Sequence, residues 1–169
     1  MTLEELNDLF PAEAETQFRD CCGSHAWARE MAETRPYPTV AALLDQAEKI
    51  WWNLYEKDWR EAFSAHPKIG DKKAAPAQQE RSAEWSKGEQ AGMDATTDAT
   101  RDKLAEANRL YQEKFGYIFI VCATGKSAEE MLEFCRARLM NDAEAEIHIA
   151  AGEQRKITEI RLRKLLNSE

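Results

Sequence analysis

The sequence is poor in glycine and proline, the two residues that most often interrupt regular secondary structure. It holds seven Gly and five Pro in 169 residues. Average usage, roughly 7% and 5%, would give about twelve and eight in a chain of this length. This scarcity excludes a collagen-like chain and a flexible linker, and it disfavours the many tight turns of an all-β protein. A helix-rich globular protein is the expectation that remains.

Long hydrophobic runs and an excess of positive charge are also missing. The longest apolar stretches, such as Tyr117 to Ala123, fall far short of the roughly 20 residues that a helix needs to span a bilayer. Asp and Glu outnumber Lys and Arg by 31 to 23, which gives a net charge of −8. Because such a surface repels polyanions, the composition predicts neither a membrane protein nor a nucleic-acid-binding protein.

Targeting signals and paired cysteines are likewise not evident. The first ten residues, MTLEELNDLF, are acidic and do not resemble a secretory signal, and the last four, LNSE, do not form a peroxisomal signal. No C-x-x-C spacing occurs, which argues against a zinc site and a disulfide framework. We expect a cytoplasmic protein with four free, buried thiols, at Cys21, Cys22, Cys122 and Cys135.

The residues that are present follow the period of amphipathic helices. Apolar residues make up 43% of the chain and charged residues 32%. Their spacing predicts an all-α, single-domain bundle of about eight to nine helices over residues 1–169. The clearest helix runs from Val40 to Leu54. Signals for helix starts or ends lie at Thr2, Pro11, Ser24, Thr39, Gly116 and Ser127.

The last predicted helix, from about Asp142 to Leu166, carries two long polar residues on its apolar stripe. The stripe consists of Ile147, Ala150, Gln154, Ile157, Arg161 and Leu165. Because an unpaired buried charge is costly, Arg161 must pair with an acid, reach solvent or bind an anion. The residues alone leave these alternatives open.

Residues 65–92 form the longest stretch without apolar periodicity, interrupted only by a possible short helix around Glu80 to Lys87. Long loops in compact domains are usually functional or mobile. His66 is the candidate acid or base there, since Pro67 disfavours an α conformation at the preceding residue and holds the imidazole at a helix exit. The alternative is an ordinary loop histidine.

Two further segments bear on the site. Glu89 lies in SKGEQAG, where Ser86 is placed to cap the local turn, and its alternative role is that of a solvated surface carboxylate. Residues 117–123 are apolar without a helical period, and no second run of strand-forming residues could pair with them. We therefore expect a buried extended connector or a helix start there.

Two features of the sequence could indicate other classes of function. Glu144 and His148 are four residues apart on one helix, but no third metal ligand with a companion spacing is evident. The sequence therefore predicts no metal site. The second alternative is a helical interaction module whose tryptophan-rich face binds a peptide. That alternative gives no reason for His66, Glu89 and Arg161 to converge.

Four motifs occur in order over nearly the whole chain. They are AHPKIGD at 65–71, WSKGEQAGM at 85–93, KFGYIFIVCATGKSAEEML at 114–132 and EIHIAAGEQRKITEIRLRKL at 146–165. Together they resemble the 2-oxo-4-hydroxy-4-carboxy-5-ureidoimidazoline (OHCU) decarboxylase family. The chain is also similar to the decarboxylase half of plant allantoin synthase, and it resembles the stand-alone form of the enzyme.

The resemblance implies an all-α homodimer without metal or organic cofactor. It implies decarboxylation of the small ureidoimidazoline substrate to (S)-allantoin and CO₂, the last step of urate degradation, in the cytoplasm or, in a eukaryote, in peroxisomes. His66, Glu89 and Arg161 match the family's catalytic residues. The positions that match its substrate-contacting residues are Pro67, Ser86, Lys87, Gly88, Gln90, Phe119, Ile120, Val121, Cys122 and Ala123.

The implied substrate explains why no cofactor is needed. Its carboxylate is on C4 and C5 belongs to a C=N bond, so electrons released with CO₂ can flow into the imine. The protein must fix the ring and deliver one proton to one face of C4. On this hypothesis His66 transfers protons and Arg161 holds anionic oxygen. Gln90 and the backbone of 119–123 bind ring amides, and Glu89 orients His66 or the ureido group, or else repels the carboxylate.

Overall fold

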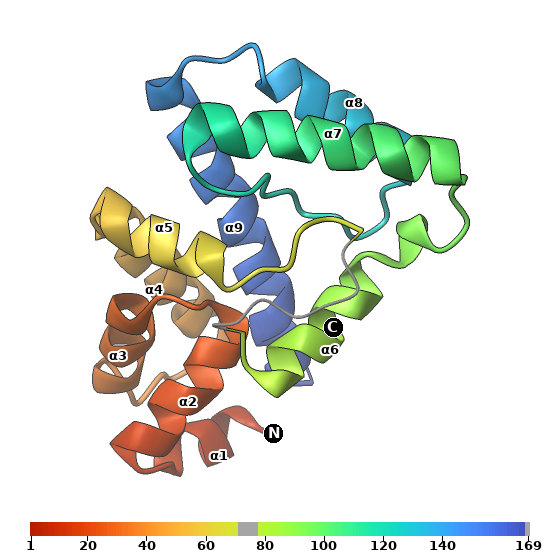
Figure 1. Cartoon of the computed structure of the whole chain (residues 1–169). Coiled ribbons are helices and arrows are strands. Elements are labelled where there is room, and N and C mark those ends of the chain that lie inside the picture. The colour runs from red at the N-terminus through yellow and green to blue at the C-terminus, as the bar shows by residue number, and fades with distance from the viewer. Residues whose placement is uncertain (71–77, 168–169) are drawn as a thin grey trace. The chain divides into compact units, whose positions relative to one another are not determined.

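The computed structural model describes residues 1–70 and 78–167. Nine α-helices and one short 3₁₀ helix account for the regular structure of this part, which contains no β-strand (Figure 1). The predicted all-α class is therefore confirmed. The chain forms two compact units, one of residues 1–62 and 155–169 and the other of residues 63–154. They are called unit 1 and unit 2 below.

Unit 1 is built from the first four helices, part of α5 and the end of α9. The helices are α1 (Leu3–Asp8), α2 (Pro11–Cys21), α3 (His25–Glu33), α4 (Val40–Asn53), α5 (Glu56–Ser64) and α9 (Ala143–Leu165). α2 packs on α3 and α3 on α4. The predicted starts are confirmed, because Thr2 forms a capping box, Pro11 begins α2, and the side chains of Ser24 and Thr39 cap α3 and α4.

Tryptophans fill the interior of unit 1. The rings of Trp51 and Trp59 lie 6.0 Å apart, and Trp59 Nε1 donates to the Trp51 carbonyl at 2.9 Å. Trp27 is fully buried and donates to the carbonyl of Ala47 at 3.1 Å. Trp27, Trp51 and Trp59 are buried, and the ring N–H groups of Trp27 and Trp59 are hydrogen-bonded, so these three rings belong to the core and not to a peptide-binding face. Trp52 is 40% exposed and packs edge-on against Trp59.

Unit 2 contains α6 (Glu80–Glu89), the 3₁₀ helix η1 (Ala91–Met93), α7 (Asp98–Phe115), α8 (Ala128–Arg138) and the first part of α9. α7 lies along α8 (Figure 1). Gly116, whose φ of 84° is left-handed, caps the C-terminal end of α7, and Ser127 forms the predicted capping box of α8. Residues 117–123 between them are not helical and all but Ile118 are buried, so of the two predicted alternatives the buried connector is confirmed and the helix start is wrong.

α9 begins as predicted and buries its polar residues. The Asp142 side chain accepts the backbone N–H of Ala145 at 2.8 Å, as a helix cap does. All six residues of the predicted stripe are buried, with Gln154 at 0% exposure and Arg161 at 2%. The helix therefore brings polar groups into both units, and each of them needs a partner.

The four cysteines are buried and free, as predicted. Burial raises the pKa of Cys22 to about 11 and that of Cys135 to about 12. Both thiols are therefore protonated at neutral pH and lack the thiolate that nucleophilic cysteines need.

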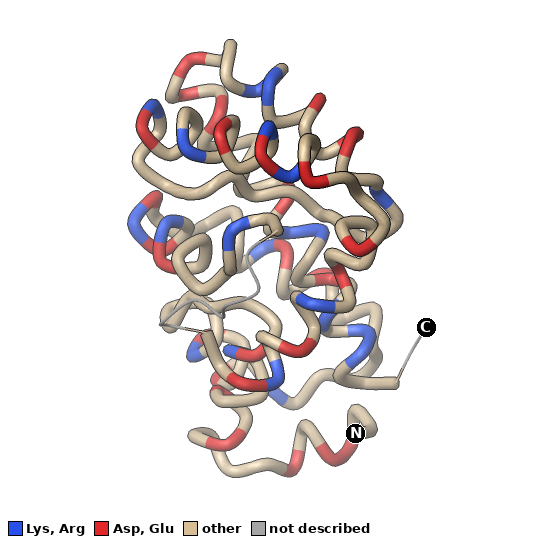
Figure 2. Tube along the Cα trace, turned by 45° about the vertical axis from the view of Figure 1, so that its right-hand side comes forward, with Lys and Arg blue, Asp and Glu red and all other residues tan. Residues whose placement is uncertain are grey.

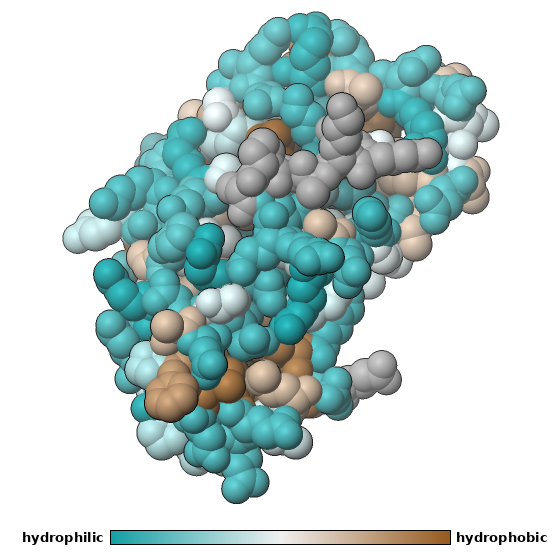
Figure 3. Space-filling view, turned by 60° about the horizontal axis from the view of Figure 1, so that its bottom comes forward, coloured by the Kyte–Doolittle hydropathy of each residue, from teal (hydrophilic) through white to brown (hydrophobic). Residues whose placement is uncertain are grey.

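The surface carries both signs of charge. Lys and Arg are interspersed with Asp and Glu along the described helices (Figure 2). Hydrophilic residues predominate on the face drawn in Figure 3, where hydrophobic residues gather in a small patch. None of the described helices is long and apolar enough to cross a membrane.

Gly92 generates a prediction about stability. A Cβ atom added there would lie 2.1 Å from the backbone oxygen of Lys126, an atom that cannot rotate away. We expect Gly92→Ala to lower the free energy of unfolding by about 1 to 3 kcal/mol, the usual cost of overpacking. Gly88→Ala is the control, because nothing lies within 4 Å of its added Cβ. Urea denaturation of both variants measures the difference, and equal stability would contradict the close approach.

Candidate active site

His66 lies in unit 2, directly after α5. Its backbone N–H donates to the Phe63 carbonyl at 3.2 Å, and Pro67 follows it. The imidazole is half-buried, and its Nε2 lies 2.6 Å from Oε1 of Gln154 in α9. The sequence marks Gln154 as a polar member of an apolar stripe, but nothing in the spacing could identify it as the partner of His66, 88 residues away.

Glu89 is the last residue of α6 and is buried, with 9% exposure. The prediction that Ser86 caps a turn is wrong. Ser86 lies inside α6, and its hydroxyl donates to the carbonyl of Ser82 one turn earlier, at 3.0 Å. The helix continues through Lys87 and Gly88, both exposed, so Ser86 has no helix start to cap.

Gln90 connects the end of α6 with the loop that follows His66. Its Oε1 accepts the backbone N–H of Gly70 at 2.9 Å. Gly70 has a φ of 84°, and a Cβ added there would lie 3.2 Å from Cε of Met93. The left-handed backbone therefore favours glycine at this position, and the loop and the end of α6 hold each other in place.

The connector residues 119–123 are buried, and their backbone is bonded to protein groups. The Cys122 N–H donates to Oε1 of Glu153 at 3.2 Å, and Lys126 Nζ donates to the Cys122 carbonyl at 2.7 Å. Burial raises the pKa of the Cys122 thiol, the carboxylates of Glu153 and Glu89 raise it further, and Lys126 opposes them. The Cys122 side chain is therefore a neutral thiol, and a ligand that takes its N–H must displace Glu153.

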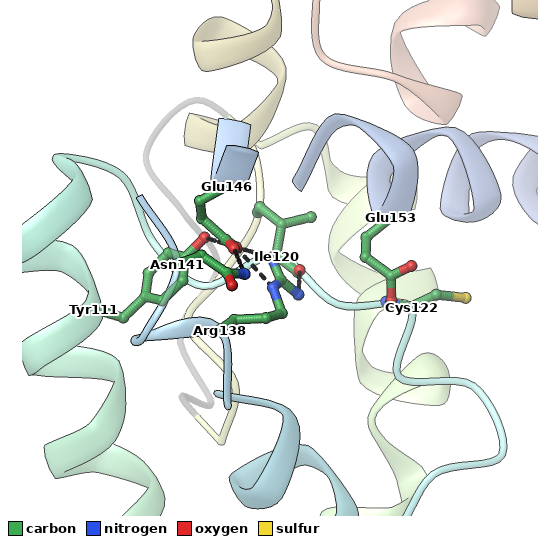
Figure 4. A network of polar contacts seen from close by, with 7 residues as sticks. All are labelled: Tyr111, Ile120, Cys122, Arg138, Asn141, Glu146 and Glu153. Carbon is green, nitrogen blue, oxygen red and sulfur yellow. Dashed lines mark hydrogen bonds and ion pairs between the residues drawn. The ribbon is translucent and has the colours of Figure 1, made fainter. Parts of the chain in front are cut away.

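A buried ion pair fixes the other end of this connector (Figure 4). Glu146 is 0% exposed and lies 2.7 Å from the Arg138 guanidinium, which also donates to the Ile120 carbonyl at 2.6 Å. The guanidinium carbon is 4.6 Å from the centroid of the Phe119 ring. Arg138 therefore neutralises a buried carboxylate and holds two residues of the predicted substrate-contacting segment.

Glu146 has two further donors. The Tyr111 hydroxyl and the Asn141 amide, the latter at 2.9 Å, both donate to its carboxylate. Burial raises the pKa of Tyr111 well above its usual value, and the hydrogen bond to Glu146 acts in the same direction. Tyr111 therefore stays a neutral donor. Neither Arg138 nor Glu146 was identified from sequence, since each lies in the charged pattern of an ordinary helix.

Arg161 lies in unit 1, whereas His66, Glu89 and the other predicted site residues lie in unit 2. Its Nη1 is 3.4 Å from the Asp20 carbonyl oxygen. Its charge lowers the pKa of the Cys22 thiol, but burial raises that pKa by more. The carbonyl is neutral and the contact is long, so the role of Arg161 toward an anionic ligand stays a prediction.

Glu144 and His148, the two possible metal ligands of the sequence analysis, make an ordinary contact within α9. His148 Nδ1 lies 2.9 Å from the backbone carbonyl of Glu144, and both residues are exposed. In the part of the chain that the structure describes, no group of three or more His, Cys, Asp or Glu is arranged to hold a metal ion.

The ion pair of Arg138 and Glu146 generates a second prediction about stability. Arg138→Met removes the cation and leaves the carboxylate buried, so the free energy of unfolding should fall by about 3 to 5 kcal/mol. Arg136→Met, at an exposed position of the same helix, is the control and should change it by less than about 0.5 kcal/mol. The double variant Arg138→Met/Glu146→Met should be more stable than Arg138→Met alone. A double variant that is no more stable would contradict a charge-based penalty.

Comparison with known proteins identifies the family. The sequence model of the family described as OHCU decarboxylase matches residues 7–163. The uric acid degradation bifunctional protein TTL of Arabidopsis thaliana is 42% identical over 157 residues, which are 92% of this chain and 48% of that protein. The chain thus spans about half the length of this relative.

Two solved structures are similar. One is an OHCU decarboxylase crystallised in the presence of (S)-allantoin, with 40% identity and a TM-score of 0.77 over 90% of this chain and 98% of that one. The other, an (S)-allantoin synthase, is 18% identical with a TM-score of 0.74, covers 98% of this chain and 54% of that one, and shows a shared fold. The resemblance predicted from the four motifs is confirmed, and the chain belongs to the OHCU decarboxylase family.

Proposed function

We propose that this chain decarboxylates OHCU to (S)-allantoin and CO₂, the last step of urate degradation, without a metal or organic cofactor. The observation that carries the proposal is that hydrogen bonds within unit 2 connect all four family motifs. His66 forms a hydrogen bond with Gln154 of α9, and Gln90 forms one with Gly70 in the loop after His66. The 119–123 connector is hydrogen-bonded to Glu153 of α9 through Cys122. The relative crystallised with (S)-allantoin supports the identity of the product.

The described groups suit the chemistry of a β-imino acid. Loss of CO₂ places electrons in the imine, so the protein has to orient the substrate and transfer one proton. His66 is the proton-transfer group, because it is a half-buried imidazole held by a hydrogen bond. Glu89 provides a buried carboxylate that orients His66 or the ureido group of the substrate, or else repels the substrate carboxylate.

The remaining assignments follow the family. The substrate-binding residues are Pro67, Ser86, Lys87, Gly88, Gln90, Phe119, Ile120, Val121, Cys122 and Ala123. Arg161 holds anionic oxygen of the substrate, because its planar guanidinium offers parallel N–H donors that match a carboxylate. Residues 1–169 act as one domain, since the family match runs through both units.

The assembly and compartment complete the proposal. The enzyme is a homodimer, as the family resemblance implies, and light scattering coupled to gel filtration would measure its mass. It works in the cytoplasm, where reducing conditions keep cysteines free like the four buried ones. Its net charge of −8 argues against binding to nucleic acid.

His66→Gln tests the proton-transfer group. The folded variant should lose about 10²- to 10⁴-fold in kcat, because this is the usual contribution of a positioned acid or base. The assay adds protein to freshly generated urate-oxidation products and follows (S)-allantoin by circular dichroism. His148→Gln, an exposed position in α9, is the matched control and should keep full activity. Near-normal turnover by folded His66→Gln would remove His66 from the mechanism.

Arg161→Lys tests the anion-binding role. Lysine keeps the charge but loses the planar fork that can hold a carboxylate at two points, so kcat/KM should fall strongly while stability changes little. Arg163→Lys is the control on the same helix, where Arg163 pairs with Glu159 at 2.9 Å. Kinetics and thermal unfolding separate the alternatives. A lower melting temperature with unchanged kcat/KM would make Arg161 a structural residue only.

A further inference from the structure

Gln154 is a fully buried amide on a helix face that is otherwise mostly apolar. An amide buried without a hydrogen bond costs roughly 1 to 3 kcal/mol, whereas a Met or Leu of similar volume would fill the same space without that penalty. The contact of its Oε1 with His66 Nε2, at 2.6 Å, is one that neither a Met nor a Leu could make at this position. The contact joins the residue to the proposed proton-transfer group.

The chemistry of the contact determines where the imidazole proton resides. A carboxamide oxygen can only accept a hydrogen bond, so the facing Nε2 must carry a hydrogen. In the neutral ring the basic lone pair is then on Nδ1. We propose that Gln154 is a positioning residue that orients His66 and holds it in the Nε2–H tautomer, so that Nδ1 is the nitrogen that exchanges a proton with the substrate.

The neighbouring residue strengthens the case. Glu153 accepts the Cys122 N–H at 3.2 Å, so two consecutive residues of α9 hold the connector and the histidine. Successive side chains of a helix point in directions about 100° apart, which lets one turn contact two different segments. α9 thereby fixes the distance between the imidazole and the peptide groups proposed to bind the substrate, and misplacement by about 1 Å can cost 10²-fold in rate.

Kinetics of two variants test the positioning role, which rests on the proposed function. Gln154→Met keeps the volume and removes the acceptor, so kcat should fall about 10- to 100-fold while KM changes less than about twofold. Gln154→Glu retains an oxygen that accepts the Nε2 hydrogen, and its kcat should lie several-fold above that of the Met variant. Thr158→Val, which removes another buried polar group of α9, is the control and should keep the wild-type kcat.

The tautomer can be measured without any activity. Long-range ¹H–¹⁵N correlation spectra of the full chain, with the His66 signals assigned by their loss in His66→Gln, report which ring nitrogen is protonated. Wild type and Gln154→Glu should show protonated Nε2, and Gln154→Met should show a mixture of tautomers. A wild-type ring protonated at Nδ1, or an unchanged tautomer and kcat in Gln154→Met, would overturn the proposal.

The two proposals fail in different ways. A folded wild-type protein that produces no (S)-allantoin contradicts the proposed function, whatever the tautomer of His66. An active wild type whose kcat is insensitive to Gln154→Met contradicts only the role of Gln154. Loss of activity in Thr158→Val to the same extent as in Gln154→Met would show a general packing effect and would also overturn the positioning role.

Discussion

Buried polar groups must find partners, and the consequences of this constraint concentrate on α9. The helix carries Glu146, Gln154 and Arg161 at exposures of 0 to 2%. Glu146 is satisfied by Arg138, Tyr111 and Asn141, and Gln154 by His66. An apolar helix could pack as well, so the polar residues fix which segments of unit 2 meet it and in what register.

This pairing explains how an irregular connector can be buried. A segment without secondary structure exposes unpaired backbone groups, which are expensive in a protein interior. Arg138 binds the Ile120 carbonyl, Glu153 the Cys122 N–H and Lys126 the Cys122 carbonyl, so side chains replace the partners that a sheet would supply. The backbone proposed to contact the substrate is thus held rigidly by groups outside the connector itself.

Local features were predictable from the sequence because their signals are local. The capping box at Ser127, the left-handed Gly116 and the burial of the α9 stripe each depend on residues a few positions apart. The pairs His66 with Gln154 and Tyr111 with Glu146 are separated by 88 and 35 residues, and no spacing rule connects them. Ser86 was misassigned because a serine near glycines is typical of a cap, whereas here α6 continues past it.

Proton transfer and the fixing of the backbone are carried out by different residues. Decarboxylation of a β-imino acid needs no electron acceptor from the protein, since the imine of the substrate accepts the electrons. It does need one proton delivered to one face of C4. The buried ion pair of Arg138 and Glu146 holds the backbone of the connector away from solvent. The proton-transfer group, His66, is instead held by a neutral amide, which orients the ring without placing a second charge beside it. A partner that accepts one ring hydrogen without carrying a charge therefore suits a histidine that must both accept and release a proton.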